Sequence, residues 1–178
     1  MLQVATNNSN IKASKEQNKK LKGNLGGSNM KLQLALDDIT LEDAVELLDK
    51  VHPYVDIIEV GSPFIIEEGM RPVRIFKEKY PDCEILADTK IMDAGEYEAE
   101  ETFKAGADYC TVLGVTDTLT IEGCVKAAKE YGKQTMVDMI CVEDVPKRVK
   151  EIEAVGVDFI GVHVGVDQQA VGITPLEK

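Results

Sequence analysis

The sequence predicts a (β/α)8 barrel, truncated at its C-terminal side to about six βα units. Short apolar runs alternate strictly with amphipathic helical patterns, which is typical of a parallel sheet covered by helices. The six expected strands end 22 to 29 residues apart, a regular unit length. Several end in a polar residue, which favours a barrel, because a barrel active site draws on many strand ends whereas an open sheet binds its ligand at one switch point.

The barrel is expected to be incomplete. Two further units would need roughly 50 residues beyond Lys178, in line with the usual size of such barrels. The first strand is not followed by a G-x-G-x-x-G turn, which weighs against a dinucleotide-binding fold.

Residues 1–29 differ in composition from the rest of the chain. Asn, Ser, Lys and Gly dominate this stretch, and no periodic apolar pattern is present. Such a segment cannot bury enough apolar surface to offset its ordering entropy, so we predict a disordered leader or linker, with the catalytic domain at residues 30–178. The leader carries a net charge of +4 and the domain −16, for a total of −12.

The expected elements follow from the apolar runs and their breakers. The expected strands are residues 32–36, 57–60, 85–87, 108–113, 134–140 and 157–164. The expected helices are residues 41–51, 67–79, 94–105, 118–131 and 142–155.

The boundaries of the first units rest on polar and breaking residues. The first strand stops at Asp37, and Thr40 or Asp38 can cap the helix that follows, whose apolar side chains fall on one face. Gly61 and Pro63 close the second strand.

The later units follow the same rule. Gly114 ends the fourth strand and Gly165 the sixth. Beyond the sixth strand, residues 168–178 read as a loop and the start of another helix, with Thr174 as its N-cap and Pro175 at its first helical position.

Composition and charge exclude several classes of function. The acidic domain makes nucleic acid and anionic membranes poor partners, although backbone amides can still bind a phosphorylated small molecule. No apolar run approaches the ~20 residues of a membrane helix, and no signal peptide is evident. The four cysteines, which lack C-x-x-C or metal-site spacing, indicate reduced thiols of a cytoplasmic protein.

Charge gathers where the third strand stops. Asp88 and Lys90 are two apart on an extended segment, so they are expected to share a face, and Asp93 follows on the turn into the next helix. Two carboxylates around one ammonium are costly for stability alone and useful for chemistry. An ion pair that caps the following helix is the alternative interpretation.

Glu59 interrupts the apolar second strand. Burying a carboxylate without a partner costs several kcal/mol, so a partner is expected. One candidate is a hard divalent cation such as Mg²⁺, with Glu59 and Asp88 as ligands from neighbouring strands. The other is a salt bridge from Glu59 to Lys90 without a metal.

His163 and Asp138 complete the polar strand ends. An imidazole titrates near neutral pH, so His163 at the rim of a barrel is a natural proton shuttle, although a lone histidine in an apolar strand can also be a core residue. Asp138 can be a catalytic acid or an inward-facing structural one.

Four segments together resemble the 3-hexulose-6-phosphate synthases, which belong to the orotidine-phosphate decarboxylase suprafamily. They are residues 32–37, 56–61 and 163–170, and the D-x-K-x-x-D motif formed by Asp88, Lys90 and Asp93. The resemblance spans residues 30–178. It implies a homodimeric (β/α)8 barrel that uses Mg²⁺ and condenses formaldehyde with D-ribulose 5-phosphate to a 3-hexulose 6-phosphate. The reaction passes through an enediolate and fixes formaldehyde in the ribulose monophosphate pathway.

The resemblance also assigns roles to residues. Glu59 and Asp88 match metal ligands, while Asp37 and Lys90 match the groups that orient the substrate and stabilise its oxyanion. Asp93 matches a carboxylate that reaches across the dimer interface into the partner's site. A bound metal would stabilise the enediolate as a Lewis acid.

Two further positions bear on the choice between related activities. His163 matches the proton-transfer residue of the synthases. The sister enzyme, 3-keto-L-gulonate 6-phosphate decarboxylase, shares the ligands, is acidic at the position of Asp138 and has an arginine at the position of Val166. The valine favours the synthase.

The resemblance places the substrate phosphate in Gly-rich loops after strands seven and eight. Binding energy far from the reacting atoms helps to position them, so we predict that this polypeptide alone is inactive or nearly so. A truncated, non-catalytic assembly module is the alternative from another functional class.

Overall fold

The computed structural model describes residues 30–174. The predicted leader at residues 1–29 lies outside the described residues, as does most of the helix start predicted from Thr174 onward. The strands are β1 Gln33–Leu36, β2 Ile57–Val60, β3 Glu84–Ile91, β4 Tyr109–Leu113, β5 Gln134–Asp138 and β6 Phe159–Gly161. The helices are α2 Leu41–Val51, η1 His52–Tyr54, α3 Ser62–Glu68, α4 Arg71–Lys79, α5 Gly95–Lys104, α6 Thr118–Tyr131, α7 Val145–Glu153 and α8 Val166–Ala170.

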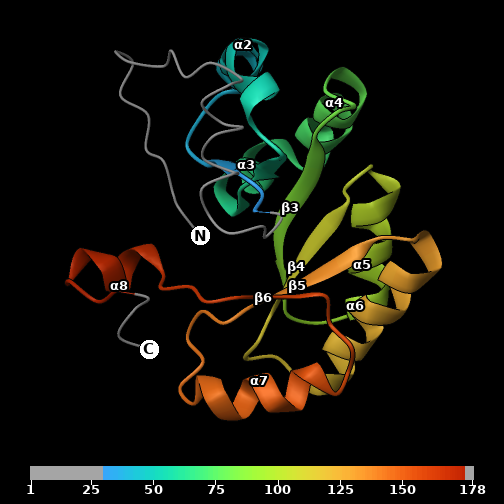
Figure 1. The fold of residues 1–178 in the computed structure, drawn as a ribbon, viewed down its shortest axis with the longest axis vertical. Coiled ribbons are helices and arrows are strands. Elements are labelled where there is room, and N and C mark those ends of the chain that lie inside the picture. The colour runs from blue at the N-terminus through green and yellow to red at the C-terminus, as the bar shows by residue number, and fades with distance from the viewer. Residues whose placement is uncertain (1–29, 175–178) are drawn as a thin grey trace.

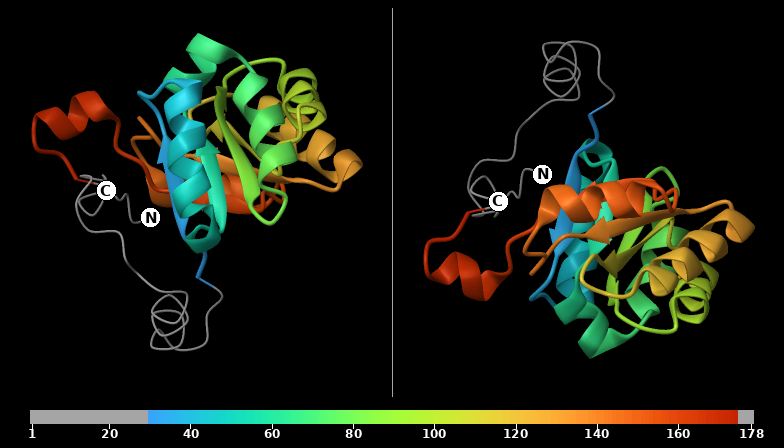
Figure 2. Two further views of the ribbon diagram at one scale, coloured as in Figure 1. Left: turned by 90° about the horizontal axis from the view of Figure 1, so that it is seen from above. Right: turned by 90° about the horizontal axis from the view of Figure 1, so that it is seen from below.

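The strands form one parallel sheet in the order β1-β2-β3-β4-β5-β6. The sheet curls into part of a barrel, and helices α2 to α7 cover its outer side (Figure 1). Because every strand runs the same way, all the C-terminal strand ends lie along one rim and all the N-terminal ends along the other. Helix α8 stands apart from this body, as both views of Figure 2 show, and it has no buried residue. The predicted alternation of parallel strands and helices, with six strands curled into part of a barrel, is confirmed for the described residues.

Most of the core lies between the sheet and its helices. One apolar cluster joins β1, β2 and β3 to α2, α3 and α4, and a second joins β4 and β5 to α5, α6 and α7. A third, smaller cluster contains Ile57, Leu86 and Tyr109, with Met136 packed against it. These four residues lie on the opposite face of their strands from the main clusters, as the period-two alternation of strand side chains requires. One layer of the inner face, below the C-terminal rim, is therefore apolar.

Helices α2 and α6 have the bounds that the sequence predicts, because both carry clear caps. The Thr40 hydroxyl accepts a hydrogen bond from the Asp43 N–H, and the Asp117 carboxylate accepts one from the Leu119 N–H. Each cap satisfies a backbone donor that the first helical turn leaves unpaired.

The helix predicted over residues 67–79 is wrong. The chain instead forms two helices, α3 and α4, separated at Gly69 and Met70. Helix α3 begins directly after Gly61 with Pro63 in its first turn, where proline costs no hydrogen bond. Gly69 ends it with a φ of +59°, a conformation that glycine adopts without steric cost.

Several strands also differ from their predicted lengths: β1 and β4 each begin one residue later, and β5 ends at Asp138 rather than at residue 140. Strand β3 continues past the apolar run at residues 85–87 through Asp88 and Lys90 to Ile91. Strand β6 covers three residues rather than the eight of 157–164, so His163 lies beyond its end. Helix α7, predicted over residues 142–155, begins only after Asp144, whose carboxylate accepts the Lys147 N–H as a cap. Pairing with neighbouring strands sets the ends of β3 and β6, and a local cap sets the start of α7.

The N-terminal rim has an aspartate immediately before every second strand. Asp56, Asp108 and Asp158 precede β2, β4 and β6, and each accepts a hydrogen bond from a backbone N–H at the start of the preceding strand in the sheet. The recurrence ties neighbouring strands together in pairs.

The thiols and the membrane prediction agree with the structure. All four cysteines are free; Cys83, Cys110 and Cys124 are buried and Cys141 is exposed. Among the described helices, none has both the length and the apolar content needed to cross a bilayer.

Candidate active site

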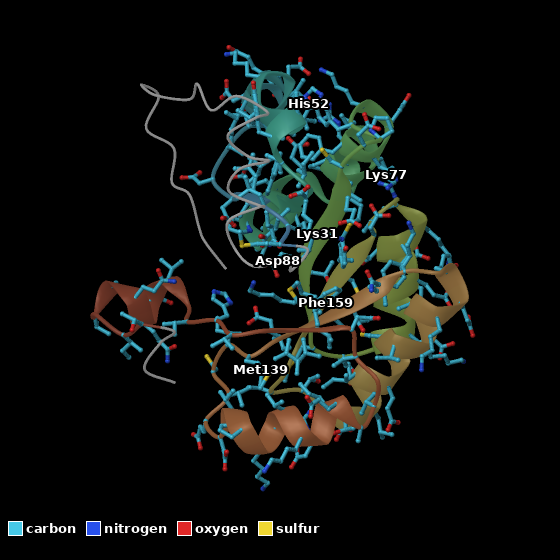
Figure 3. The ribbon with its side chains drawn as sticks, in the orientation of Figure 1. Lys31, His52, Lys77, Asp88, Met139 and Phe159 are labelled. Atoms are coloured by element: carbon cyan, nitrogen blue, oxygen red, sulfur yellow. The ribbon has the colours of Figure 1, made fainter. Side chains whose placement is uncertain are left out.

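Six charged side chains gather at the C-terminal rim of the sheet. They are Asp37, Glu59, Asp88, Lys90, Asp138 and His163, from the ends of β1, β2, β3 and β5 and the segment after β6. Hydrogen bonds, ion pairs and mutual electrostatic effects connect all six. Figure 3 shows Asp88 near the centre of the molecule, whereas His52 and Lys77 lie out among the helices. We refer to these six residues as the rim cluster.

Asp88 is the most completely held member of the rim cluster. Its side chain is buried, and the Thr111 hydroxyl donates to its Oδ1 at 2.8 Å. The Ser62 hydroxyl lies 2.9 Å from Oδ2, and the Lys90 ammonium also donates to Oδ2. A buried carboxylate needs such donors, and together they fix its orientation.

Lys90 contacts two carboxylates from an unusual backbone conformation. Its Nζ bonds to Asp88 and lies 3.4 Å from Asp138 Oδ2, while its φ is +48°, uncommon for a residue other than glycine. Burial alone would lower the pKa of Lys90, but the charges and hydrogen bonds of Asp88 and Asp138 raise it above its ordinary value. The side chain is therefore a fixed ammonium at neutral pH.

Among the described residues 30–174, Glu59 has no ion-pair partner. Its Oε2 accepts a hydrogen bond from the Gln33 amide at 2.5 Å. Burial raises the pKa of Glu59 to about 7, the Gln33 hydrogen bond opposes the shift, and the negative charges of Asp88 and Asp37 add to it. The expected alternative, a salt bridge from Glu59 to Lys90, is not formed, because Lys90 pairs with the two aspartates.

Asp37 occupies space left by a glycine. A Cβ added at Gly61 would lie 2.1 Å from Asp37 Oδ1, so a larger residue there would displace the carboxylate. Burial raises the pKa of Asp37, and the charge of Asp88 raises it further against the opposing effect of Lys90. Asp37 therefore lies within electrostatic reach of both Asp88 and Lys90.

Asp138 and His163 form a carboxylate–imidazole pair. His163 Nδ1 lies 3.0 and 2.9 Å from the two oxygens of Asp138, and the Ile140 N–H donates to Asp138 Oδ1 at 2.9 Å. The hydrogen bond from Asp138 raises the pKa of His163. Burial would raise the pKa of Asp138, but its bonds to His163 and Ile140 lower it overall.

Asp93 lies outside the rim cluster. It is exposed on the turn between β3 and α5, and its Oδ1 accepts the N–H of Ala94 at 2.7 Å. Within one chain the third residue of the D-x-K-x-x-D motif thus contacts only its own turn.

The donor set of the rim cluster fits a hard divalent cation. Four carboxylates meet one lysine and one histidine; burial raises the pKa of Glu59 and of Asp37, and the negative charges of the neighbouring carboxylates add to the shift. Within residues 30–174, no three ligand atoms of the rim cluster lie within 4.8 Å of one another. Mg²⁺ commonly takes one or two protein carboxylates and fills its other positions with water and substrate oxygens, so Glu59 and Asp88 suit it.

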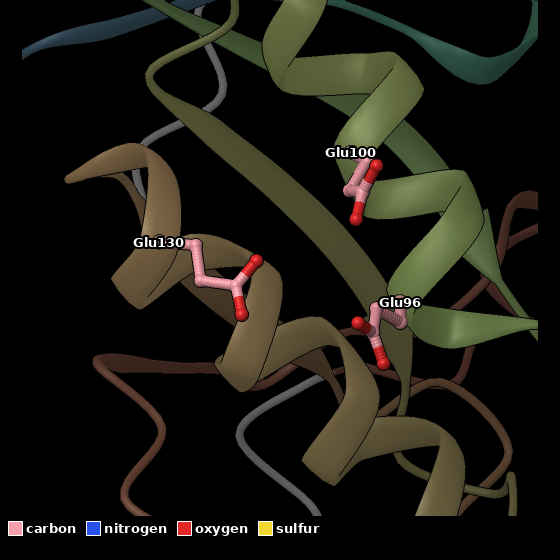
Figure 4. Close-up of side chains that lie close together, drawn as sticks. All are labelled: Glu96, Glu100 and Glu130. Atoms are coloured by element: carbon pink, nitrogen blue, oxygen red, sulfur yellow. The ribbon is translucent and has the colours of Figure 1, made fainter.

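A second acidic group lies on the outer helices. Glu96, Glu100 and Glu130 bring ligand atoms within 4.8 Å of one another on α5 and α6 (Figure 4). Lys126 pairs with Glu96 and Lys104 with Glu100, at side chains that face solvent. Ordinary surface ion pairs account for this group.

Three supporting residues were missed from the sequence. Ser62 and Thr111 hold Asp88, and Gln33 holds Glu59. Gln33 and Thr111 are polar residues inside apolar strands, a signal like the one that identified Glu59. Ser62 gave no such signal, because a serine after Gly61 reads only as part of a turn.

Comparison with known proteins gives consistent matches. The model of the orotidine 5'-phosphate decarboxylase / HUMPS family matches residues 30–178. The 3-hexulose-6-phosphate synthase of Bacillus subtilis strain 168 is 50% identical over 149 residues, which are 84% of this chain and 71% of that protein.

Solved structures point the same way. The crystal structure of 3-hexulose-6-phosphate synthase from Salmonella typhimurium is 59% identical, with a TM-score of 0.81 over 83% of this chain and 70% of that chain. The 3-keto-L-gulonate-6-phosphate decarboxylase from Vibrio cholerae is 31% identical, with a TM-score of 0.75 over 82% of this chain and 68% of that chain.

Proposed function

Because the chain belongs to the orotidine 5'-phosphate decarboxylase / HUMPS family, we propose that it catalyses a Mg²⁺-dependent aldol condensation. Its relatives named 3-hexulose-6-phosphate synthase are aldehyde-lyase-type enzymes. The proposed substrates are formaldehyde and D-ribulose 5-phosphate, and the product is a 3-hexulose 6-phosphate. The observation that carries the proposal is the rim cluster, in which a carboxylate–imidazole pair lies beside a fixed ammonium and buried carboxylates.

His163 is the proposed proton-transfer group. Asp138 holds its Nδ1, which leaves Nε2 as the nitrogen that can take a proton from the ketose and return it. Its raised pKa makes the neutral imidazole a better base once a substrate proton is in reach. Deprotonation of ribulose 5-phosphate gives an enediolate, whose carbon then attacks formaldehyde.

Lys90 is the proposed stabiliser of the developing negative charge. Its ammonium is already desolvated and oriented by Asp88 and Asp138, so little reorganisation is needed when an oxyanion forms beside it. Asp37, next to Lys90 in the rim cluster, is proposed to accept a hydrogen bond from a substrate hydroxyl and so to orient the sugar.

Glu59 and Asp88 are the proposed metal ligands. A bound Mg²⁺ would supply Lewis-acid stabilisation to the ketose oxygens. Glu59 then acts as an anion although its pKa is raised to about 7, because a nearby cation favours the charged form.

Asp93 gives the proposal a quaternary element. It is exposed and does not join the rim cluster of its own chain, and we propose that it reaches the site of a partner subunit in a homodimer. The free thiols fit a protein that works in the cytoplasm, which we also propose.

The alternative within the family is decarboxylation of 3-keto-L-gulonate 6-phosphate. Identity to the synthase structure is 59%, against 31% to the decarboxylase structure. Val166, at the start of α8, stands where the resemblance gives the decarboxylase an arginine. Both features favour the synthase.

The test is a paired assay of the purified chain with each ketose phosphate, with Mg²⁺ or with EDTA. Mg²⁺-dependent loss of formaldehyde with ribulose 5-phosphate supports the synthase, and release of carbon dioxide supports the decarboxylase. The proposal would be contradicted if the chain neither turned over nor bound either sugar phosphate.

A further inference from the structure

Strand β3 bulges where it carries Asp88 and Lys90. It pairs with β4 through Ala87 and Cys110, and again through Ile91 and Val112. Between these two pairs, β3 has three residues and β4 has only Thr111. Such bulges break the regular ladder and redirect side chains, and they are frequent beside active sites.

Thr111 supplies the hydrogen bonds that the broken ladder lacks. Its carbonyl accepts the Thr89 hydroxyl at 2.9 Å, and its own hydroxyl accepts the Lys90 N–H at 2.8 Å. The same hydroxyl donates to Asp88 Oδ1 at 2.8 Å. Thr111 is 4% exposed, so water cannot readily replace any of these contacts.

The direction of each bond is fixed by chemistry. An amide N–H can only donate and an ionised carboxylate can only accept, so the single hydroxyl proton of Thr111 must point to Asp88. One oxygen atom therefore holds the backbone of Lys90 in its left-handed conformation and the carboxylate of Asp88 in one rotamer. A non-glycine residue in that conformation persists only where its surroundings enforce it.

We propose that Thr111 is a positioning residue, whose hydroxyl sets the relative placement of the Asp88 carboxylate and the Lys90 ammonium. Substrate contact is not part of this role. The proposal rests on the proposed function, because that function makes Asp88 a metal ligand and Lys90 the group that stabilises the oxyanion. Its structural content, that one hydroxyl fixes both residues, is testable without catalysis.

The experiment compares three variants of the whole chain. Thr111→Val keeps the shape and removes the hydroxyl, whereas Thr111→Ser keeps the hydroxyl. The control is Thr102→Val, which removes another buried hydroxyl, on α5, that bonds only to the Glu98 carbonyl. Amide hydrogen exchange at Lys90 is measured by NMR, and Mn²⁺ affinity by its paramagnetic relaxation of water protons.

In the valine variant, we expect the Lys90 amide to exchange at least roughly ten-fold faster than in wild type. We expect Mn²⁺ to bind at least roughly ten-fold more weakly, the usual scale for loss of a group that orients a metal ligand. The serine variant should return both values to within about three-fold of wild type, and the control should leave both near wild type. Unchanged Lys90 exchange in Thr111→Val, or equal losses in the serine variant, would overturn the positioning role. Absence of Mn²⁺ binding in wild type would count against the proposed metal alone, because amide exchange still decides the role of Thr111.

Discussion

Both rims of the sheet carry acids at strand ends, but the partners and the pKa values of these acids differ between the two rims. At the N-terminal rim, Asp108 accepts the Ile85 N–H and pairs with Lys77 and Lys133 at 2.7 and 2.6 Å. Burial alone would raise the pKa of Asp108, but these partners lower it. At the C-terminal rim, four carboxylates share one lysine and one histidine, and the pKa of Glu59 rises to about 7.

The backbone shows the same contrast. Three turns that enter strands from the N-terminal side use glycines at positive φ, namely Gly106, Gly132 and Gly156. The three residues other than glycine at positive φ within the described chain are Lys90, Ala94 and Cys141, all in segments at the C-terminal rim. Glycine adopts such angles without cost, whereas other residues need support from their neighbours.

The difference separates stability from function. The three aspartates that precede strands at the N-terminal rim bond to backbone N–H groups of neighbouring strands, so they serve the fold. Acids at the C-terminal rim are crowded around one lysine and one histidine, and Lys90 among them has a strained backbone. This arrangement costs stability and leaves carboxylate oxygens for a ligand. The predictions below test this division.

The largest expected effect on stability comes from Asp108→Ala. The change leaves two lysines and the Ile85 N–H without their partner, so we expect the free energy of unfolding to fall by about 1 to 3 kcal/mol. Urea denaturation measures it. The control is Asp82→Ala, an exposed acid near the same rim, which should change stability by less than about 0.5 kcal/mol. Equal effects of the two variants would contradict a special role for Asp108.

Glu59→Gln is expected to act in the opposite direction. The unfolded chain loses the Glu59 proton near 4.5 and the folded chain near 7, so between these pH values the folded state holds more protons and stability falls as pH rises. With both proteins in EDTA, the free energy of unfolding of the variant relative to that of wild type should therefore rise by roughly 1 to 2 kcal/mol between pH 5 and pH 8, after allowance for partial solvent exposure. A stability difference that does not change with pH would show that Glu59 titrates normally.

Asp138→Asn tests the carboxylate–imidazole pair. The hydrogen bond and charge of Asp138 raise the pKa of His163, so the variant should lower that pKa, as an NMR titration of the imidazole would show. In wild type this pair adds stability below the ordinary histidine pKa of 6.5, and the contribution is lost as pH rises through the folded-state value. Asp117→Asn, at the cap of α6, should leave the His163 titration as it is. A His163 pKa unaffected by Asp138→Asn would mean that the pair does not form in solution.

The smallest effect concerns thiol exposure. Cys141 follows β5 at the C-terminal rim and is exposed, whereas Cys83, which precedes β3 at the other rim, is buried, and burial raises its pKa. A thiol reagent should therefore label Cys141 rapidly in the native protein, and Cys83, Cys110 and Cys124 only after unfolding. Cys141→Ser should remove the fast phase; a fast phase that survives this change would place an open thiol elsewhere.

Local sequence signals predicted the alternation of strands and helices, and they predicted which acids would meet. Apolar runs and caps such as Thr40 and Asp117 act within a few residues, so they can be read directly. The position of Glu59 in an apolar strand was informative for the same reason, because a buried acid is costly unless something compensates for it.

Features that depend on contacts between distant segments were not predicted. The bulge at Lys90 is held by Thr111, 21 residues away, and the end of β6 depends on pairing with β5. Asp88 and Lys90 do approach one another, but through this bulge rather than through simple strand alternation. Acids at positions 56, 108 and 158 gave no sequence signal of their own, since their partners are backbone groups of other strands.

Isothermal titration with Mg²⁺ tests the central claim, that the C-terminal rim holds a divalent cation between Glu59 and Asp88. We predict one Mg²⁺ per chain in wild type and in Asp108→Asn, and loss of that binding in both Glu59→Gln and Asp88→Asn. Binding that survives in Glu59→Gln and Asp88→Asn, or that disappears in Asp108→Asn while the fold is retained, would contradict it.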